Sequence, residues 1–136
     1  MELKAFSALI LNLPLLTFSG FIPPIFHKLA RLKWLTLDEN KLSGGIPSSI
    51  FNISTVEMIA LAANSFSGNL PQNIGSFLPS LEELRLHTNN LYGVLPSSIS
   101  NASQLMILDL GDNEFNGSIP YSLGDLKFLK KLALGM

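Results

Sequence analysis

The sequence contains no cysteine, which excludes a disulfide framework, a catalytic thiolate and a cysteine-ligated zinc site. Charged residues are also few: they make up 14% of the 136 residues, with nine basic against ten acidic side chains. Because this balance lacks the basic excess that binds phosphate backbones, we expect no nucleic-acid partner. No apolar run reaches the roughly 18 to 20 residues that a membrane-spanning helix needs. The 47% of hydrophobic residues nevertheless suffices for the core of one domain.

Sequence motifs of catalytic sites are missing as well. The chain has neither the G-x-S-x-G turn of a serine nucleophile nor the H-R-D and D-F-G triplets of a protein kinase. His27 and His87 lie far apart in the sequence, and the acidic stretch 109–114 lacks the alternating spacing of a calcium loop. We therefore expect a non-enzymatic chain with no metal ion and no cofactor.

A repeated unit dominates the sequence. The pattern [LI]-x-L-x-x-N-x-[LF]-x-G-x-[IL]-P occurs four times, and the copies begin at Leu35, Ile59, Leu84 and Leu108. The asparagines of the four copies follow one another every 24 or 25 residues, at Asn40, Asn64, Asn89 and Asn113. A fainter copy begins at Leu11 and has Leu16 in the asparagine position, and a partial copy begins at Leu126. Such periodicity is the signature of a stacked repeat architecture.

The repeat divides the chain into three segments: a degenerate first unit at 1–28, four regular units at 29–125 and a truncated sixth unit at 126–136. The first segment has an alternative interpretation, because Lys4 before the apolar stretch 5–18 also fits a secretory signal peptide. Asn12 and Pro14 interrupt that stretch, so the repeat interpretation is favoured.

Each part of the unit predicts a local structure. The L-x-L segment is a short strand whose leucines enter a shared core, and a chain that returns every 24 residues stacks these strands in parallel. The asparagine ends the strand and can bond buried backbone groups of the turn. The glycine allows a turn that other residues resist, and Ser-Ser-Ile at 48–50 and 97–99 favours a short 3₁₀ turn with Ile50 and Ile99 inward. These features predict an α/β solenoid with a parallel concave sheet and 3₁₀ or turn segments on the convex side.

The unit L-x-x-L-x-L-x-x-N-x-L-x-G-x-I-P resembles the plant-type leucine-rich repeat of receptor-like kinases and receptor-like proteins, and the resemblance implies a right-handed superhelix. Residues 70–81 and 98–105 are similar to the immune pattern-recognition subgroup of those kinases. The family's ectodomains carry end caps, often with paired cysteines, and full-length relatives carry a serine/threonine kinase. This chain has neither, so it resembles an internal piece of an ectodomain or the product of a truncated gene.

The resemblance implies an extracellular or plasma-membrane ectodomain module that binds a peptide, protein or glycan on its concave face, with a co-receptor as a further partner. Two alternatives stay open at this point. One is an intracellular leucine-rich repeat scaffold for a protein partner, and the other is a truncated gene product without an independent role.

The residues that alternate with the core leucines are expected to face the concave side. Around the third unit, Ala60, Ala62 and Ala63 would form a shallow floor between two groups of larger side chains. An exposed tryptophan and an arginine beside such a floor are the residue types that dominate binding hot spots. The predicted ligand-binding residues are Trp34, Thr36, Asp38, Met58, Glu83, Arg85, His87 and Asp109.

Three N-x-S triplets are candidate N-glycosylation sites, at Asn52, Asn101 and Asn116. All three lie outside the L-x-L segments, so we expect their glycans on the outer or lateral faces of a secreted chain, away from the concave sheet.

Overall fold

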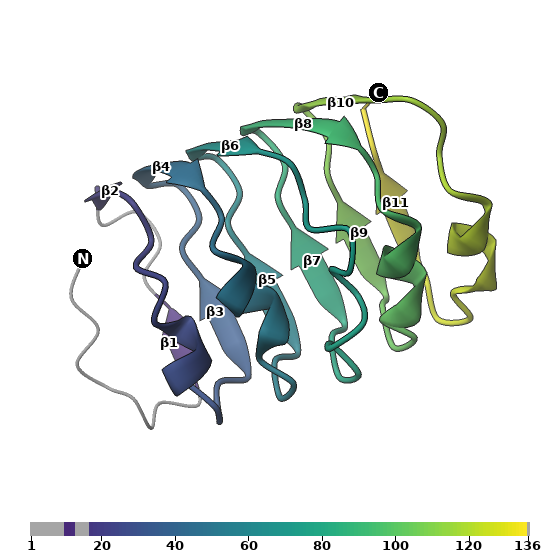
Figure 1. Ribbon diagram of the computed structural model, residues 1–136, viewed down its shortest axis with the longest axis horizontal. Helices are drawn as coiled ribbons and strands as arrows, with labels where there is room; N and C mark the ends of the chain where they lie inside the picture. The colour runs from purple at the N-terminus through teal and green to yellow at the C-terminus, as the bar shows by residue number, and fades with distance from the viewer. Residues whose placement is uncertain (1–9, 13–16, 136) are drawn as a thin grey trace.

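The computed structural model describes residues 10–12 and 17–135. The units follow one another along the long axis of an open solenoid, from the purple end to the yellow end of Figure 1. Within the described residues the strands form two parallel sheets, one of six strands and one of five. The predicted solenoid of stacked parallel strands is confirmed.

The six-stranded sheet contains the L-x-L segment of every unit. Its strands, in spatial order, are β1 (Ile10–Asn12), β3 (Trp34–Thr36), β5 (Met58–Ala60), β7 (Glu83–Arg85), β9 (Ile107–Asp109) and β11 (Lys131–Ala133). Neighbouring strands pair so that equivalent residues of successive units face each other, as Trp34 faces Met58 and Met58 faces Glu83. The central residues Leu35 and Ile59 are fully buried, which leaves the flanking positions to face outward.

A second parallel sheet, which the sequence analysis did not predict, runs along an adjacent side of the solenoid (Figure 1). Its strands are β2 (Ser19–Gly20), β4 (Lys41–Gly45), β6 (Ser65–Gly68), β8 (Asn90–Val94) and β10 (Glu114–Asn116). The sequence pattern predicts a turn for this glycine-containing segment. The segment nevertheless buries one central apolar residue in each regular unit, such as Leu42 or Phe66, and two-residue alternation is the pattern of a strand.

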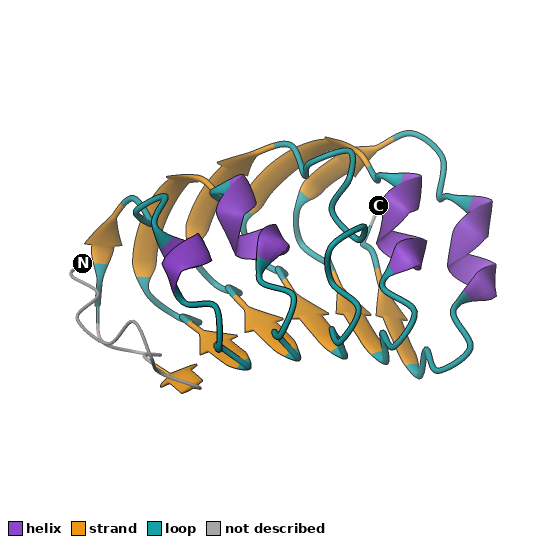
Figure 2. Ribbon diagram, turned by 60° about the horizontal axis from the view of Figure 1, so that its bottom comes forward, coloured by secondary structure: helices purple, strands orange, loops and turns teal. Residues whose placement is uncertain are grey.

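Short 3₁₀ helices lie side by side on a further side of the solenoid (Figure 2). They are η1 (Phe26–Lys28), η2 (Ser48–Asn52), η3 (Ser97–Asn101) and η4 (Tyr121–Asp125). Ile50 and Ile99 point into the core, as the Ser-Ser-Ile pattern predicted. The third unit, which has the 25-residue spacing, forms turns at 72–77 in place of a helix.

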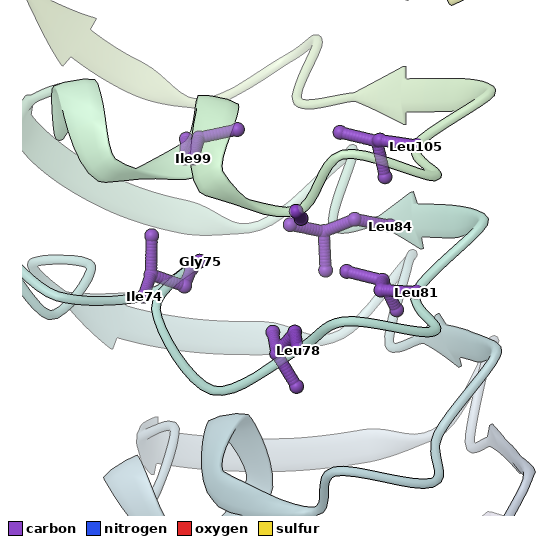
Figure 3. A pocket seen from close by; sticks show the side chains of 8 residues that line it. Ile74, Gly75, Leu78, Leu81, Leu84, Ile99 and Leu105 are labelled. Atoms are coloured by element: carbon purple, nitrogen blue, oxygen red, sulfur yellow. The ribbon is translucent and has the colours of Figure 1, made fainter. Parts of the chain in front are cut away.

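The core is continuous from unit to unit, and its largest fully buried side chains include Phe26, Phe51 and Phe66. A cavity of about 10 Å³ lies between the third and fourth units (Figure 3). It is lined by apolar residues, among them Ile74, Leu78 and Ile99. A space of this size and composition is too small and too apolar to hold a ligand or an ordered water molecule.

The repeat asparagines Asn40, Asn64, Asn89 and Asn113 form an asparagine ladder, in which each side chain bonds a backbone group of the preceding unit. The Nδ2 group of Asn89 donates hydrogen bonds to the carbonyl of Leu86 in its own unit and to that of Leu61 in the preceding unit, both at 3.0 Å. Its Oδ1 atom accepts the N–H of Phe66, also in the preceding unit, at 2.9 Å. Asn64 and Asn113 make the equivalent contacts one unit earlier and one unit later. Leu16, the residue in the asparagine position of the first unit, lies outside the described residues.

We predict that Asn89→Ala lowers the free energy of unfolding by about 1 to 3 kcal/mol, because it leaves buried backbone groups of two units without partners. Urea unfolding followed by circular dichroism measures the change. The matched control is Asn90→Ala, an exposed neighbour, for which we expect a change within about 0.5 kcal/mol. Equal losses for both variants would contradict a specific role of the buried amide.

Gly75 allows the third unit to approach the helix η3 closely. A Cβ atom at Gly75 would lie 2.0 Å from the backbone oxygen of Ser98, a distance that real side chains do not reach. Gly45, at the end of β4, is the opposite case, because a Cβ atom there would meet nothing within 4 Å. The close approach at Gly75 therefore depends on the missing side chain. At Gly45 there is room for a side chain, so a glycine is not required there.

We predict that Gly75→Ala destabilises the fold by about 1 to 3 kcal/mol through steric conflict with the neighbouring backbone. Gly45→Ala should instead stabilise it by about 0.4 to 1 kcal/mol, because alanine restricts the unfolded chain without strain in the folded one. Thermal unfolding of the two variants, which carry the same added methyl group, gives the comparison. A melting temperature that falls equally in both would contradict the structural distinction.

Candidate ligand-binding face

The outward residues of the six-stranded sheet form rows that cross the strands. One row contains Trp34, Met58, Glu83, Ile107 and Lys131, and the next contains Thr36, Ala60, Arg85, Asp109 and Ala133. Adjacent strands lie about 4.8 Å apart, so each row presents one side chain per strand to a molecule lying along the solenoid. The properties of the face therefore change step by step from unit to unit.

Trp34 is held in an exposed position at the second unit. Its indole Nε1 donates to Glu57 Oε2 at 3.4 Å, and the other carboxylate oxygen of Glu57 pairs with Lys33 Nζ at 3.0 Å. The hydrogen bond from Lys33, and after it the one from Trp34, lowers the pKa of Glu57 below its ordinary value. The indole remains 45% exposed, so it offers a large apolar surface to a ligand at little cost in side-chain ordering.

Small side chains form the floor that follows Met58, the residue opposite Trp34 in the neighbouring strand. Ala60 and Ala62 are buried and Ala63 is half-buried. At one edge of this floor the carboxylate of Asp38 accepts the Ala62 N–H at 2.7 Å. Burial raises the pKa of Asp38 above its ordinary value, although the bond from Ala62 and the nearby His87 and Arg85 act in the opposite direction.

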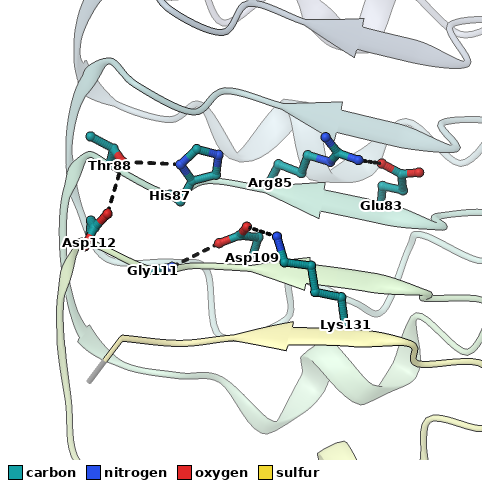
Figure 4. A network of polar contacts seen from close by, with 8 residues as sticks. All are labelled: Glu83, Arg85, His87, Thr88, Asp109, Gly111, Asp112 and Lys131. Atoms are coloured by element: carbon teal, nitrogen blue, oxygen red, sulfur yellow. Dashed lines mark hydrogen bonds and ion pairs between the residues drawn. The ribbon is translucent and has the colours of Figure 1, made fainter.

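Polar side chains follow one another along the fourth unit, on β7 and just after it (Figure 4). The Arg85 guanidinium forms an ion pair with Glu83 at 2.7 Å, and the Nδ1 atom of His87 lies 3.2 Å from the Thr88 hydroxyl. Arg85 Nε is buried and no described residue accepts its hydrogen bond. The positive charge of Arg85 is therefore neutralised within its own strand.

Asp109 in the fifth unit is engaged within the protein. Its carboxylate pairs with Lys131 Nζ at 2.8 Å and accepts the Gly111 N–H at 3.4 Å (Figure 4). Burial opposes ionisation of Asp109, but the bonds from Lys131 and Gly111, with the nearby His87, hold its pKa below the ordinary value. Asp109 therefore shapes the face without offering a free carboxylate.

The predicted residues fall into two groups. Trp34, Thr36, Asp38 and Met58 lie on or just after β3 and β5, and Glu83, Arg85, His87 and Asp109 lie on or just after β7 and β9. Trp34 and Arg85 are separated by β5, and each has its own acidic partner. The Thr36 hydroxyl donates to the side-chain oxygen of Asn12 in the first unit.

Sequence reasoning did not predict the ion pairs that three polar residues, Lys33, Glu57 and Lys131, form at this face. These residues form ion pairs between units. The sequence feature that could have indicated the pairs is opposite charge at a spacing close to one repeat. Lys33 and Glu57 are 24 residues apart, and Asp109 and Lys131 are 22 apart. A search for complementary charge at the repeat spacing finds both pairs.

The three glycosylation candidates lie outside the six-stranded sheet. Asn52 and Asn101 are the last residues of η2 and η3, and Asn116 ends β10 in the second sheet. All three side chains are exposed. Within the part of the chain that the structure describes, no three acidic or histidine side chains are placed to hold a metal ion. No helix in the same part has the length and apolar character needed to cross a membrane.

Comparisons with known proteins agree with this architecture. Leucine-rich repeat family models match residues 31–53 and 79–135, which together are more than half of the chain. A search of curated protein sequences gives no match.

Solved structures provide closer parallels. The leucine-rich repeat ectodomain of the receptor kinase SOBIR1 from Arabidopsis thaliana is 33% identical, over 89% of this chain and 66% of that chain, with a TM-score of 0.83. The Arabidopsis receptor kinase HAESA, in complex with the peptide hormone IDA and the co-receptor SERK1, is 34% identical, over 85% of this chain and 19% of that chain, with a TM-score of 0.81.

A chain of the BIR3–SERK2 complex from Arabidopsis thaliana is 30% identical, over 90% of this chain and 66% of that chain, with a TM-score of 0.79. The present chain thus spans just under two thirds of the SOBIR1 chain and less than a fifth of the HAESA chain. With its repeat pattern, two parallel sheets and asparagine ladder, the chain belongs to the leucine-rich repeat family, and its solenoid is similar to the ectodomains of plant receptor kinases.

Proposed function

We propose that this chain is an extracellular recognition module of a plant receptor-like kinase or receptor-like protein, and that it binds a peptide or a protein segment on the six-stranded sheet. The observation that carries the proposal is the exposed indole of Trp34, fixed by Glu57 beside a floor of alanines. The similarity to HAESA, whose structure contains a peptide hormone and a co-receptor, supports the same ligand class.

The mechanism is recognition without chemistry. A peptide that lies along the rows would contact apolar side chains at the second and third units. At the fourth and fifth units it would contact polar side chains that are paired with one another. Burial of an apolar ligand side chain against Trp34 and Met58 would supply affinity, and the polar half would select the ligand by hydrogen bonding. Any signal would be transmitted by segments beyond this chain.

Truncation of the tryptophan tests the proposal. Linear peptides selected from a random display library against the purified chain should lose about 2 kcal/mol or more of binding free energy with Trp34→Ala. The matched control is Phe77→Ala, which removes an aromatic side chain that is also half-exposed but lies in the turn segment away from this sheet. If Trp34→Ala and Arg85→Ala each lower the binding free energy by less than about 0.5 kcal/mol, this face is not a binding site and the proposal is wrong.

Glycan occupancy tests the extracellular assignment. Expressed with a secretory leader in plant cells, the chain should carry N-glycans on Asn52 or Asn101, whose exposed side chains at the ends of η2 and η3 leave the six-stranded sheet free. Mass spectrometry of the peptides after glycosidase treatment identifies the sites, with Asn52→Gln and Asn101→Gln as controls. Complete absence of glycan on the protein purified from its natural source would favour the intracellular scaffold.

A further inference from the structure

The backbone N–H groups just beyond the strands of the six-stranded sheet have different partners in successive units. In the third unit, the N–H of Ala62 donates to Asp38, which belongs to the preceding unit. In the fifth unit, the N–H of Gly111 donates to Asp109. In both contacts a carboxylate oxygen of a nearby aspartate accepts the hydrogen bond of this N–H.

The fourth unit lacks such a partner. The equivalent group is the N–H of His87, and the residue one unit earlier, in the position of Asp38, is Ala62, whose methyl group cannot accept a hydrogen bond. No described residue accepts a hydrogen bond from this N–H. The alanine floor therefore ends at a half-buried residue whose backbone N–H has no partner among the described residues.

Asp38 supplies the complementary feature on the other side of the floor. Its carboxylate is half-buried and bonded through one oxygen to Ala62, and no described cation lies within 4 Å of it. The neighbouring Arg85 is engaged by Glu83, and Lys131 is engaged by Asp109. A half-buried carboxylate without a cationic partner is stabilised by any cation that can reach it.

The surrounding charges decide which acceptor fits the His87 N–H. Glu39, Asp112 and Glu114 follow the strands at the same end of the sheet and form no ion pair with a described residue. Together with Asp38 they outnumber Lys41, which occupies in the second unit the position of Glu114 in the fifth, so this edge has a surplus of negative charge. A ligand carboxylate would be repelled here, whereas the neutral carbonyl of a peptide bond would not.

We propose that the alanine floor receives an extended peptide segment that places a lysine or arginine side chain against Asp38 and gives a main-chain carbonyl to the N–H of His87. The inference rests on the proposed function, since it names the chemistry of the peptide that the face selects. Because the Asp38 carboxylate reaches the Ala62 N–H, it lies about one strand spacing, roughly 5 Å, from the His87 N–H, a span that two extended residues cover. Small side chains at Ala60 and Ala62 let the ligand backbone lie close to the sheet.

Blocked pentapeptides provide the test, with the sequence acetyl-Ala-Ala-X-Ala-Ala-amide and X as lysine, norleucine or glutamate. The readout is the chemical shift of the Ala62 and His87 amides during titration of the ¹⁵N-labelled chain. We expect the lysine peptide to bind about tenfold more tightly than the norleucine peptide, as for a hydrogen bond to a charged group, and the glutamate peptide to bind more weakly than both. A norleucine peptide with a free amino terminus determines whether an α-amino group can replace the side chain.

Asp38→Asn isolates the charge. The asparagine oxygen still accepts the Ala62 N–H, so hydrogen-exchange protection of that amide should persist while the preference for lysine falls to about twofold or less. Asp125→Asn at the end of η4 makes the same change in net charge away from this sheet and should leave the preference intact.

The possible outcomes separate the two proposals. If none of the peptides shifts the Ala62 or His87 amides, and library peptides also fail to bind, the proposed function is wrong. If peptides bind with equal affinity whatever X is, or if the lysine preference survives Asp38→Asn, peptide recognition stands and the assignment of Asp38 and His87 is wrong. Loss of the preference in Asp38→Asn alone supports the assignment.

Discussion

The hydrogen bonds of the repeat asparagines hold this solenoid together. Each strand of the six-stranded sheet has only three residues, too few for independent stability. Each amide of Asn64, Asn89 and Asn113 bonds carbonyls of its own unit and of the preceding one, and it accepts an N–H of the second sheet. One side chain thus fixes the distance between two units and the junction between two sheets. The stacked apolar core supplies most of the free energy, and the ladder determines the register in which it packs.

Because the asparagine ladder and the core are formed by inward residues, the outward residues of the six-stranded sheet can vary without disturbing the fold. This division explains why the face changes character within a few units while the fold does not. Trp34 and the alanines give one half an apolar surface, and Glu83, Arg85, Asp109 and Lys131 give the other half paired charges. Charges that are already paired add selectivity more than affinity, so the proposed recognition would draw its binding energy mainly from the indole.

The repeat pattern predicted the parallel sheet, the inward leucines, the rows and the 3₁₀ turns, because each follows from a period that recurs in every unit. The second sheet was missed because β4, β6, β8 and β10 each bury a single apolar residue two positions before a glycine, a pattern that a turn also satisfies. The turns of the third unit agree with the 3₁₀ or turn segments expected on this side, but the close approach of Gly75 to Ser98 could not be predicted, because no local pattern contains a contact between units. The ion pairs were missed because their members lie one repeat apart, outside any local window.

The third unit concentrates the departures from the repeat, and they share a physical basis. Ala60 and Ala62 replace larger side chains on the concave side, while Gly75 and an extra residue replace the helix on the opposite side. Its core residues Ile59, Leu61 and Phe66 remain fully buried, and Asn64 keeps its place in the ladder. A repeat can therefore change on both surfaces at once without losing its stacking, since its inward core residues and its asparagine are retained. On the concave side this change leaves the His87 N–H without the acceptor that the Ala62 N–H receives from Asp38, so a deviation in the third unit produces the unpaired donor on which the proposed peptide contact in the fourth unit depends.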